Sequence, residues 1–599
     1  MQDKLLKRDE VKEELTWRLE DIYESEDKWE EDLKACEKIG EELASYAGRL
    51  STSSATLLEF FKLYEKSELM QSAIYGYAHM RHDQDTSNTK YTGMYQRAYS
   101  TLVQASEKVA FVEPEILEMS DETIEKFYKE QSELENYRVT ITEIRRLKDH
   151  ILSKEMEELL ASAGEVLGAS QNSYSMLSNA DMKFPEVKDG NGEDVQLSDG
   201  RFVPIQNSKD RVLRKNAFEA YYSKYAEYKN TWAAMYAGEV KGRIFKAKAR
   251  KYDNIFEAAV DHNNVSPLVC DRLFEAVHDN MDKMHRYVSL RKKLLGVDDL
   301  HMYDVYVSMI PEFDMKVTYE EAKELSLKAL APLGEDYLEI VKKAYDERWI
   351  DVPENEGKRG GAYSSGVYGV HPYMLLNYND TLNDVFTLVH EMGHSMHTWY
   401  SEHAHNVFDA GYKIFVAEVA STTNEMLLFH YLKNNAKDEK EKAFIINHLL
   451  ESFKSTMFRQ TMFEEFERKS GRMAEEGEPL TADSLSELYY NLNLEYFGKD
   501  MNMDDLIRYE WCRIPHFYYN FYVYQYATSF AAAVAIANRI VKGEAGVVEA
   551  YKKFLSSGCT QDPVSLLKIA GVDLTTKAPL EEALAVFGEA IEEMESIKL

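Results

Sequence analysis

Helix-breaking residues and cysteines are scarce in this sequence. Its 599 residues include only 12 Pro, 28 Gly and 4 Cys. So few breakers in such a length favour a mostly α-helical fold. The four cysteines are widely scattered and form no CxxC pair, which excludes a disulfide framework. Reduced thiols in a cytoplasmic protein are therefore expected.

The sequence also has fewer basic than acidic residues and no long apolar run. The chain has 71 basic and 104 acidic residues, a formal net charge of −33. Such an acidic surface repels nucleic acid and anionic lipid, so we expect binding to neither. The longest strongly apolar run, residues 530–537, is too short to cross a bilayer. The N-terminal sequence lacks the apolar core of a signal peptide, which again predicts a cytoplasmic protein.

What the chain does contain is a succession of amphipathic helical patterns. Its length exceeds what one core holds, so we expect a helical lobe over residues 1–200 and a catalytic domain over residues 201–599. Residues 184–204, around a DGNG turn, predict a β-hairpin, and residues 351–379 predict a small sheet. Since Pro372 cannot donate to a ladder, the strand over residues 371–378 is either an edge strand or begins after the proline.

The sequence HEMGH, residues 390–394, follows this predicted sheet. Thr381 and Asp384 form a capping box that predicts the start of a helix. His390 and His394 then lie one helical turn apart, so that both imidazoles can bind one ion. Glu391 points beside the ion, where its carboxylate can take a proton from an attacking water. The pattern predicts a zinc hydrolase with Glu391 as general base.

A catalytic zinc site needs a third protein ligand and keeps its fourth position for water or substrate. The extended motif HExxHxxGxxH is excluded, because its glycine position is His397 and its last position is Tyr400. Glu418 lies in the apolar stretch KIFVAEVA, where an acid is costly unless it is paired or bound to a metal. We therefore predict Glu418 as the third ligand.

Two neighbouring residues are predicted to support the ligands. Glu425 lies seven residues after Glu418 on the same helix face, which suits a carboxylate that orients a ligand histidine. The alternative is an ordinary solvated acid. His397, one turn past His394, is predicted to donate a hydrogen bond to a ligand residue rather than to bind the ion itself.

Several segments together resemble oligoendopeptidase F, of the thimet oligopeptidase and neurolysin group of metallopeptidases. They are HEMGHSMH, EVASTTNEML, RGGAYSSG and HFYYNFYVYQYATSF, and the N-terminal TWRLEDIYES resembles the opening of that family. Their order is the expected one, so the resemblance spans nearly the whole chain. It implies a mostly α, two-lobed, multi-helical zincin with a small β-sheet beside the HExxH helix and a deep substrate channel. It also implies cytoplasmic endopeptidase activity on short oligopeptides, with one zinc ion per chain.

The resemblance also implies roles for residues in the late aromatic segment. The family places a histidine and tyrosines against the scissile carbonyl, and His516, Tyr522 and Tyr524 are the nearest matches. Tyr518 and Tyr519 remain competitors, because the thimet branch has a longer, glycine-containing stretch here. The metal ligands and the base predicted above match those of the family.

Substrate contacts are predicted on the strand before the metal helix. A peptide could add as a further strand beside residues 371–377, with His371, Tyr373 and Asn377 in contact and Tyr519 joining from the late segment. Two alternatives stay open: a zinc carboxypeptidase or dipeptidyl carboxypeptidase of similar fold, and a helical peptide-binding scaffold with a structural metal. Glu391 disfavours the scaffold, since a structural site has no use for a base. The oligomeric state is left open.

Overall fold

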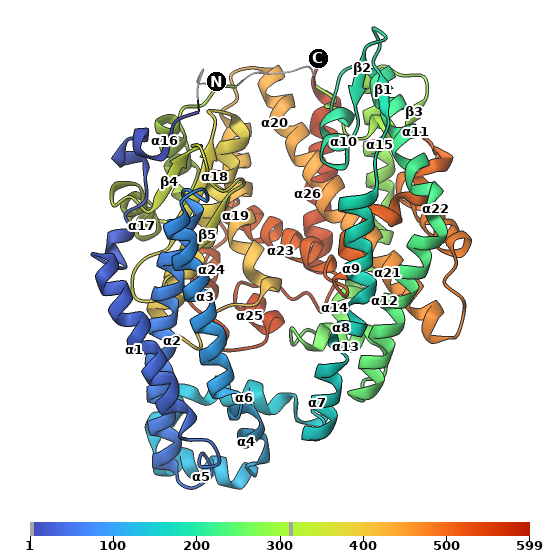
Figure 1. The fold of residues 1–599 in the computed structure, drawn as a ribbon. Helices are drawn as coiled ribbons and strands as arrows, with labels where there is room; N and C mark the ends of the chain where they lie inside the picture. The colour runs from blue at the N-terminus through green and yellow to red at the C-terminus, as the bar shows by residue number, and fades with distance from the viewer. Residues whose placement is uncertain (1–4, 311–314, 599) are drawn as a thin grey trace. The chain divides into compact units, whose positions relative to one another are not determined.

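The computed structural model describes residues 5–310 and 315–598. The chain divides into two compact units, each assembled from three separate stretches. In the described residues helices dominate, and each sheet has only two or three strands (Figure 1). The predicted mostly α fold class is thus confirmed, whereas the substrate channel stays a prediction. Within this part of the chain no helix combines the length and apolar character of a membrane span.

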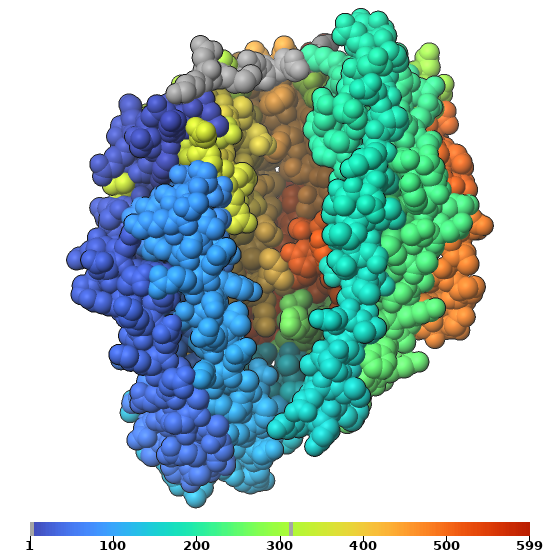
Figure 2. Space-filling view, viewed as in Figure 1, coloured from blue at the N-terminus to red at the C-terminus, as the bar shows by residue number. Residues whose placement is uncertain are grey.

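The first unit comprises Met1–Lys148, Asp314–Tyr431 and Ile536–Val572. Its N-terminal helices α1, α2 and α3 pack side by side (Figure 2). The elements of this unit are α1 (Glu26–Ala44), α2 (Ser54–Asp83), α3 (Thr89–Val109), α4 (Val112–Glu118), α5 (Asp121–Glu130), α6 (Arg138–Arg146), α16 (Tyr319–Ala329), α17 (Glu335–Asp346), β4 (Ile350–Pro353), β5 (Tyr363–Ser365), β6 (Tyr373–Tyr378), α18 (Leu382–Ala404), α19 (Ile414–Asn434), α24 (Val547–Leu555) and α25 (Pro563–Ile569).

The second unit comprises Asp149–Phe313, Leu432–Ala535 and Asp573–Leu599. Helix α23 (Tyr524–Val541) begins in the second unit and ends in the first, and the last turn of α19 extends into the second unit. Its other elements are α7 (Lys154–Ser162), α8 (Gly164–Leu167), α9 (Ala169–Ser175), β1 (Glu186–Lys188), β2 (Asp194–Gln196), α10 (Asp199–Gln206), α11 (Arg211–Glu227), α12 (Lys229–Ala249), α13 (Ile255–Asp261), α14 (Leu268–Asp279), α15 (Met281–Leu295), β3 (Leu300–His301), α20 (Glu439–Ser452), α21 (Arg459–Glu475), α22 (Ala482–Phe497), β7 (Met501–Asn502) and α26 (Ala578–Ser596). The antiparallel pair β1 and β2 is the predicted hairpin.

The compact units do not follow the predicted division at residue 200, which lies inside the second unit. A shared hydrophobic core is the reason. Trp29 of α1 and Tyr77 of α2 belong to one buried cluster with Val367 and Leu375 of the sheet region. Helices α1 and α2 therefore share a core with the sheet region. Which stretch carries which function stays a prediction.

The predicted small sheet is three-stranded, with strand order β4, β6, β5. Strand β6 pairs in parallel with β4 and antiparallel with β5, with Ser364 opposite Met374. It is the central strand and begins at Tyr373, directly after Pro372. The expectation of an edge strand was therefore wrong and that of a start after the proline was right, because the missing N–H of Pro372 falls outside the ladder. The edge strand beside α18 is β5.

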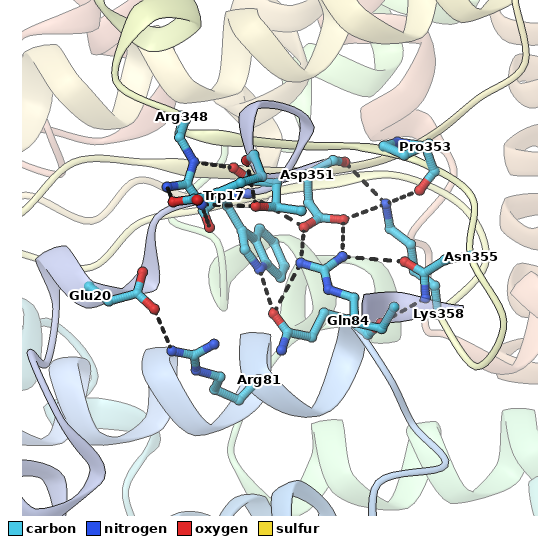
Figure 3. A network of polar contacts seen from close by, with 12 residues as sticks. Trp17, Glu20, Arg81, Gln84, Arg348, Asp351, Pro353, Asn355 and Lys358 are labelled. Carbon is cyan, nitrogen blue, oxygen red and sulfur yellow. Dashed lines mark hydrogen bonds and ion pairs between the residues drawn. The ribbon is translucent and has the colours of Figure 1, made fainter. Parts of the chain in front are cut away.

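A buried polar network ties the N-terminal segment to β4 (Figure 3). Arg8 donates two hydrogen bonds to the Asp351 carboxylate, and Lys358 lies 2.7 Å from the same group. The side chains of Asp351 and Lys358 are both fully buried. Trp17 of the opening motif donates its indole N–H to Gln84 at 3.1 Å and its backbone N–H to Asp351. The opening motif therefore supports the sheet, through ion pairs whose loss would leave a charge buried.

Candidate active site

Helix α18 carries the HEMGH sequence and starts as predicted. The Thr381 hydroxyl accepts the backbone N–H of Asp384 at 3.2 Å, and the Asp384 carboxylate accepts the N–H of Thr381 at 3.0 Å. This capping box satisfies donors that the first helical turn leaves open. Its apolar positions, Val385 and Val389 among them, are fully buried. The side chains of the two histidines on the adjoining face are 26% and 18% exposed, so a ligand can reach them.

Gly393, the glycine of HEMGH, lets α19 approach α18 closely. A Cβ atom on Gly393 would lie 2.6 Å from the backbone oxygen of Ala420 and 2.6 Å from the Cα of Ser421. No real side chain fits at that distance, and backbone atoms cannot turn away as a flexible side chain can. The absent side chain therefore brings Glu418, one turn before these atoms, beside the two histidines.

Three side chains form a compact set of metal donors. His390 Nε2 lies 3.2 Å from His394 Nε2 and 3.4 Å from Glu418 Oε2, and His394 Nε2 lies 3.6 Å from Glu418 Oε2. Bonds of about 2.0–2.1 Å in a tetrahedral zinc site place neighbouring ligand atoms roughly 3.3 Å apart. The three donor atoms therefore fit three corners of a zinc tetrahedron, and among the described residues this is the group found able to hold a metal.

Replacement of Gly393 by alanine should disrupt this donor set. Because the new methyl group would collide with the α19 backbone, the two helices must separate and Glu418 must withdraw from the histidines. We expect metal affinity to fall at least about tenfold and the free energy of unfolding to fall by about 1–3 kcal/mol. Metal-buffer titration and urea unfolding measure the two effects. Gly93→Ala in α3 is the matched control, because its Cβ would meet open space, and equal losses in both variants would contradict the prediction.

Glu425 of α19 contacts His390 at Nδ1, the ring nitrogen that does not belong to the donor set. Its Oε1 accepts a hydrogen bond from His390 Nδ1 at 2.5 Å. With Nδ1 directed at the carboxylate, Nε2 faces the other two donor atoms. Burial lowers the pKa of His390, but the hydrogen bond and charge of Glu425 outweigh burial and raise it to about 9. Glu425 therefore lies where the sequence places an orienting carboxylate.

Glu391 is buried beside the donor set, with 7% of its surface exposed. Burial raises the pKa of its carboxyl to about 7; the charge of His390 and the backbone N–H of Ser364 oppose this shift, and the nearby Glu418 adds to it. A carboxyl group that titrates near neutrality is well matched to proton transfer at physiological pH. Since Ser364 belongs to β5, the base also lies beside the edge strand.

His397 does not take the predicted supporting position. It is 1% exposed and stacks on Tyr412, with ring centroids 3.8 Å apart. Burial lowers the pKa of His397 to about 3, and its Nδ1 finds no hydrogen-bond partner among the described residues. It is a neutral core residue, because one further helical turn carries its ring into the packing of α18 against Tyr412 and Phe554.

The predicted substrate contacts on β6 are only partly exposed to a ligand. His371 stacks on Trp349 and bonds Asp21, and Tyr373 is fully buried with its hydroxyl on the Arg18 carbonyl. These two assignments are corrected: Tyr373 of the central strand and His371, two residues before it, both belong to the core. Asn377 instead donates to the carbonyl oxygens of Arg359 and Gly361. It lines a pocket of about 210 Å³ with Gly361 and with Thr387, which lies one helical turn before Glu391.

The late aromatic segment belongs to the second unit. The rings of His516, Tyr519, Tyr522 and Tyr526 gather with centroids 5.4–6.4 Å apart. Tyr519 is 48% exposed, and His516, Tyr522 and Tyr526 are partly exposed. We name these four residues the exposed ring cluster. Tyr526 was missed by the sequence reasoning, although its spacing of four residues from Tyr522 is a signal for one helix face.

Two predicted tyrosines of this segment turn inward. Tyr524 is 1% exposed and packs edge to face on Phe256, and Tyr518 is 7% exposed and packs on Tyr174. The assignment of Tyr524 as a group that touches substrate is therefore corrected, because its position in the first turn of α23 faces the core. The donor set lies in the first unit and the exposed ring cluster in the second, so their joint action stays a prediction.

Comparison with known proteins gives matches over nearly the whole chain. Residues 205–586 match the model of peptidase family M3, and residues 115–184 match that of oligopeptidase F. Oligopeptidase PepF of Bacillus subtilis is 47% identical over 98% of this chain and 88% of its own length. The group B oligopeptidase PepB of Streptococcus agalactiae is 40% identical over 98% of both chains.

Solved structures agree with these matches. A crystal structure of oligoendopeptidase F from Enterococcus faecium, 38% identical, matches with a TM-score of 0.73 over 96% of this chain and 99% of that chain. A peptidase structure from Chlamydophila abortus, 34% identical, matches with a TM-score of 0.94 over 99% of this chain and 100% of that chain.

Proposed function

This chain belongs to peptidase family M3 and is a metalloendopeptidase of the oligoendopeptidase F type, and we propose that it hydrolyses short oligopeptides with one zinc ion and with Glu391 as general base. His390, His394 and Glu418 would hold the ion. The observation that carries the proposal is the spacing of the three donor atoms, 3.2–3.6 Å, next to a buried carboxyl group. The names of the relatives support peptides as the substrate class.

The mechanism assigns proton transfer to Glu391. A bound zinc ion would polarise the scissile carbonyl and lower the pKa of the attacking water. Glu391 accepts the proton of this water as it attacks, and passes it to the departing amine. Its pKa of about 7 leaves both the ionised and the protonated form accessible near neutral pH. Glu425 holds the His390 ring through the 2.5 Å hydrogen bond to Nδ1 and so would keep Nε2 available to a bound ion.

Strand β5 replaces β6 as the strand to which we expect a peptide to add. It pairs with β6 on one side, and Ser364 contacts both Glu391 and, through its hydroxyl at 2.8 Å, Ser395 of α18. A peptide bound along this edge uses main-chain hydrogen bonds and places a backbone carbonyl beside the base. Because an added strand can extend past the base in both directions, this binding mode suits internal cleavage and weak side-chain selectivity.

His516 and Tyr522 of the exposed ring cluster are proposed to stabilise the negative charge that develops on the carbonyl oxygen. The family resemblance and the partial exposure of both side chains support this role.

Tyr522→Phe should lower kcat by about 100- to 1000-fold, the usual effect of one lost oxyanion donor. Tyr524→Phe should keep a kcat near that of the wild type, because the Tyr524 ring is buried. Steady-state kinetics on a quenched fluorescent peptide compare the two variants. Each removes one tyrosine hydroxyl, and the two positions are two residues apart. A larger loss in Tyr524→Phe would reverse the assignment.

The overall function is tested by mass spectrometry of the fragments from a random peptide pool, with and without a chelator. We expect internal cleavage that the chelator abolishes and that zinc restores. Peptides with a blocked C-terminus should be cut as well as free ones. Release of only C-terminal residues or dipeptides, with blocked peptides resistant, would instead indicate a carboxypeptidase or dipeptidyl carboxypeptidase.

A cytoplasmic location is proposed for this activity. All four cysteines are free thiols, and Cys36, Cys270 and Cys512 are buried. Free thiols are typical of a reducing compartment. Fractionation of the producing cell tests the location, and recovery of the activity outside the cytoplasm would contradict it.

A further inference from the structure

The loop that carries the exposed ring cluster has a strained backbone. Within residues 516–523, Asn520 and Phe521 both adopt the left-handed conformation, with φ of 55° and 57°. Residues other than glycine rarely do so, and a bulky side chain such as that of Phe521 is particularly disfavoured. Two such residues in succession persist only where surrounding contacts impose the conformation.

A buried ion pair from two helices binds both halves of the loop. Arg243 of α12 and Glu467 of α21 lie 2.5 Å apart, Nη1 to Oε1. Arg243 donates from Nη2 to the carbonyl oxygen of Phe517 at 2.7 Å. Glu467 Oε1 accepts the backbone N–H of Phe521, the second left-handed residue, at 2.8 Å. The pair therefore fixes the loop main chain on either side of Tyr519.

Packing on the inner side of the loop reinforces these bonds. The Arg243 guanidinium lies 5.5 Å from the ring centroid of Phe521, which is 2% exposed. That ring also lies against Gly471 of α21, where an added Cβ would come within 3.5 Å of it. One turn before Glu467 on α21, Glu464 accepts the backbone N–H of Tyr524 just past the loop.

The ion pair itself is out of reach of any substrate. The side chains of Arg243 and Glu467 are 6% and 0% exposed. A buried pair of charges contributes little to stability compared with apolar residues of the same size, because both charges lose their hydration. Besides the contact of Arg243 Nε with Glu239 Oε1 at 3.3 Å, this pair directs its charges at the main chain of one strained loop. Its geometry is therefore better explained by a need to fix that loop than by a need for stability.

We propose that Arg243 and Glu467 are positioning residues for peptide hydrolysis, which hold the 516–523 loop in the shape that presents His516 and Tyr522 to the substrate. The inference rests on the proposed function, since it assumes that these two side chains act on the scissile bond. Arg243 and Glu467 touch no reacting atom and act through the loop.

The direct test replaces the ion pair conservatively. Glu467→Gln keeps an acceptor for the Phe521 N–H but removes the charge nearest to Arg243, which also lies 3.3 Å from Glu239. Arg243→Lys keeps a charge but loses the separate N–H group that donates to the Phe517 carbonyl oxygen. We expect kcat to fall by about ten- to hundredfold in both variants, the effect of displacing a catalytic group by about 1 Å, with KM and bound zinc unchanged. Unchanged kcat in folded variants would overturn the inference.

Variants of Asn520, an exposed residue of the loop, still test the inference if Glu467→Gln and Arg243→Lys fail to fold. Asn520→Val places a β-branched side chain in the left-handed region and should lower kcat, whereas Asn520→Gly tolerates that region and should restore it. Lys251→Val is the matched control, because Lys251 is exposed, belongs to the same unit and has φ of 63°. Full activity in Asn520→Val, or an equal loss in Lys251→Val, would overturn the inference.

A double-mutant cycle separates this inference from the proposed function. In a His516→Ala, Tyr522→Phe background, Glu467→Gln should cost almost no further kcat, because the groups that it positions are gone. A full additional loss in that background would indicate a purely structural role and overturn the inference. If His516→Ala and Tyr522→Phe alone leave kcat unchanged, the proposed role of the loop fails first, whatever the ion pair does.

Discussion

Replacement of Glu391 by glutamine is expected to abolish peptide hydrolysis while the metal stays bound. Glutamine has the same shape but cannot accept the proton of the attacking water at neutral pH. The three donor residues are untouched, so the ion should remain in place. General-base catalysis is typically worth 100- to 10,000-fold, and we expect kcat to fall by about 1000-fold. Initial rates on a quenched fluorescent peptide, with zinc measured by elemental analysis on the same sample, give both quantities.

A neighbouring carboxyl group provides the control for this experiment. Glu402, on the same helix, is partly buried, and burial raises the pKa of its carboxyl to about 7, as for Glu391. It lies outside the donor set, so Glu402→Gln should hydrolyse peptides at a rate close to that of the wild type. Normal turnover by Glu391→Gln would remove Glu391 from the mechanism, and an inactive Glu402→Gln would show that the loss is not specific to the base.

Glu418→Ala is expected to remove the metal and the activity together. Of the donors found among the described residues, two histidines 3.2 Å apart would be left, and a zinc site with two ligands binds far more weakly than one with three. We expect zinc content to fall from about one ion per chain to near zero after dialysis, and hydrolysis to fall with it. Elemental analysis measures the first change and the peptide assay the second.

Different outcomes separate the roles of the two glutamates. Glu391→Gln should hold zinc without turning over substrate, whereas Glu418→Ala should hold none, and added zinc at high concentration should restore some activity only to Glu418→Ala. Full zinc occupancy in Glu418→Ala would identify another residue as the third ligand. Glu402→Ala again serves as the control and should retain its zinc.

Local patterns predicted the geometry around the two histidines, whereas metal binding and catalysis there stay proposals. The spacing of His390 and His394 and the capping box at Thr381 depend only on residues a few positions apart, and the structure has both. Glu418 could be predicted although it lies 24 residues after His394, because an acid within an apolar helix is costly unless it is paired or bound to a metal. The amphipathic helical patterns along the rest of the chain likewise predicted the mostly α fold.

Features set by distant contacts could not be predicted in the same way. Tyr522 and Tyr524 look equivalent in the sequence, and only the packing of the second ring on Phe256 separates them. The left-handed turn at Asn520 and Phe521 depends on Glu467, which has no local signal for it. The central position of β6 likewise depends on which strands it pairs with, and so do the buried places of His371 and Tyr373.

The interleaving of the two units has a consequence for how the protein is made. Trp29 and Leu375 share one core, yet hundreds of residues separate them along the chain. At roughly 5–20 residues per second, a nascent chain waits roughly 20–70 seconds between the emergence of the two. During that interval the apolar faces of α1 to α3 lack their sheet, so the unfinished chain needs protection from aggregation. For the same reason, no single cut in the gene would yield either unit as a protein that folds alone.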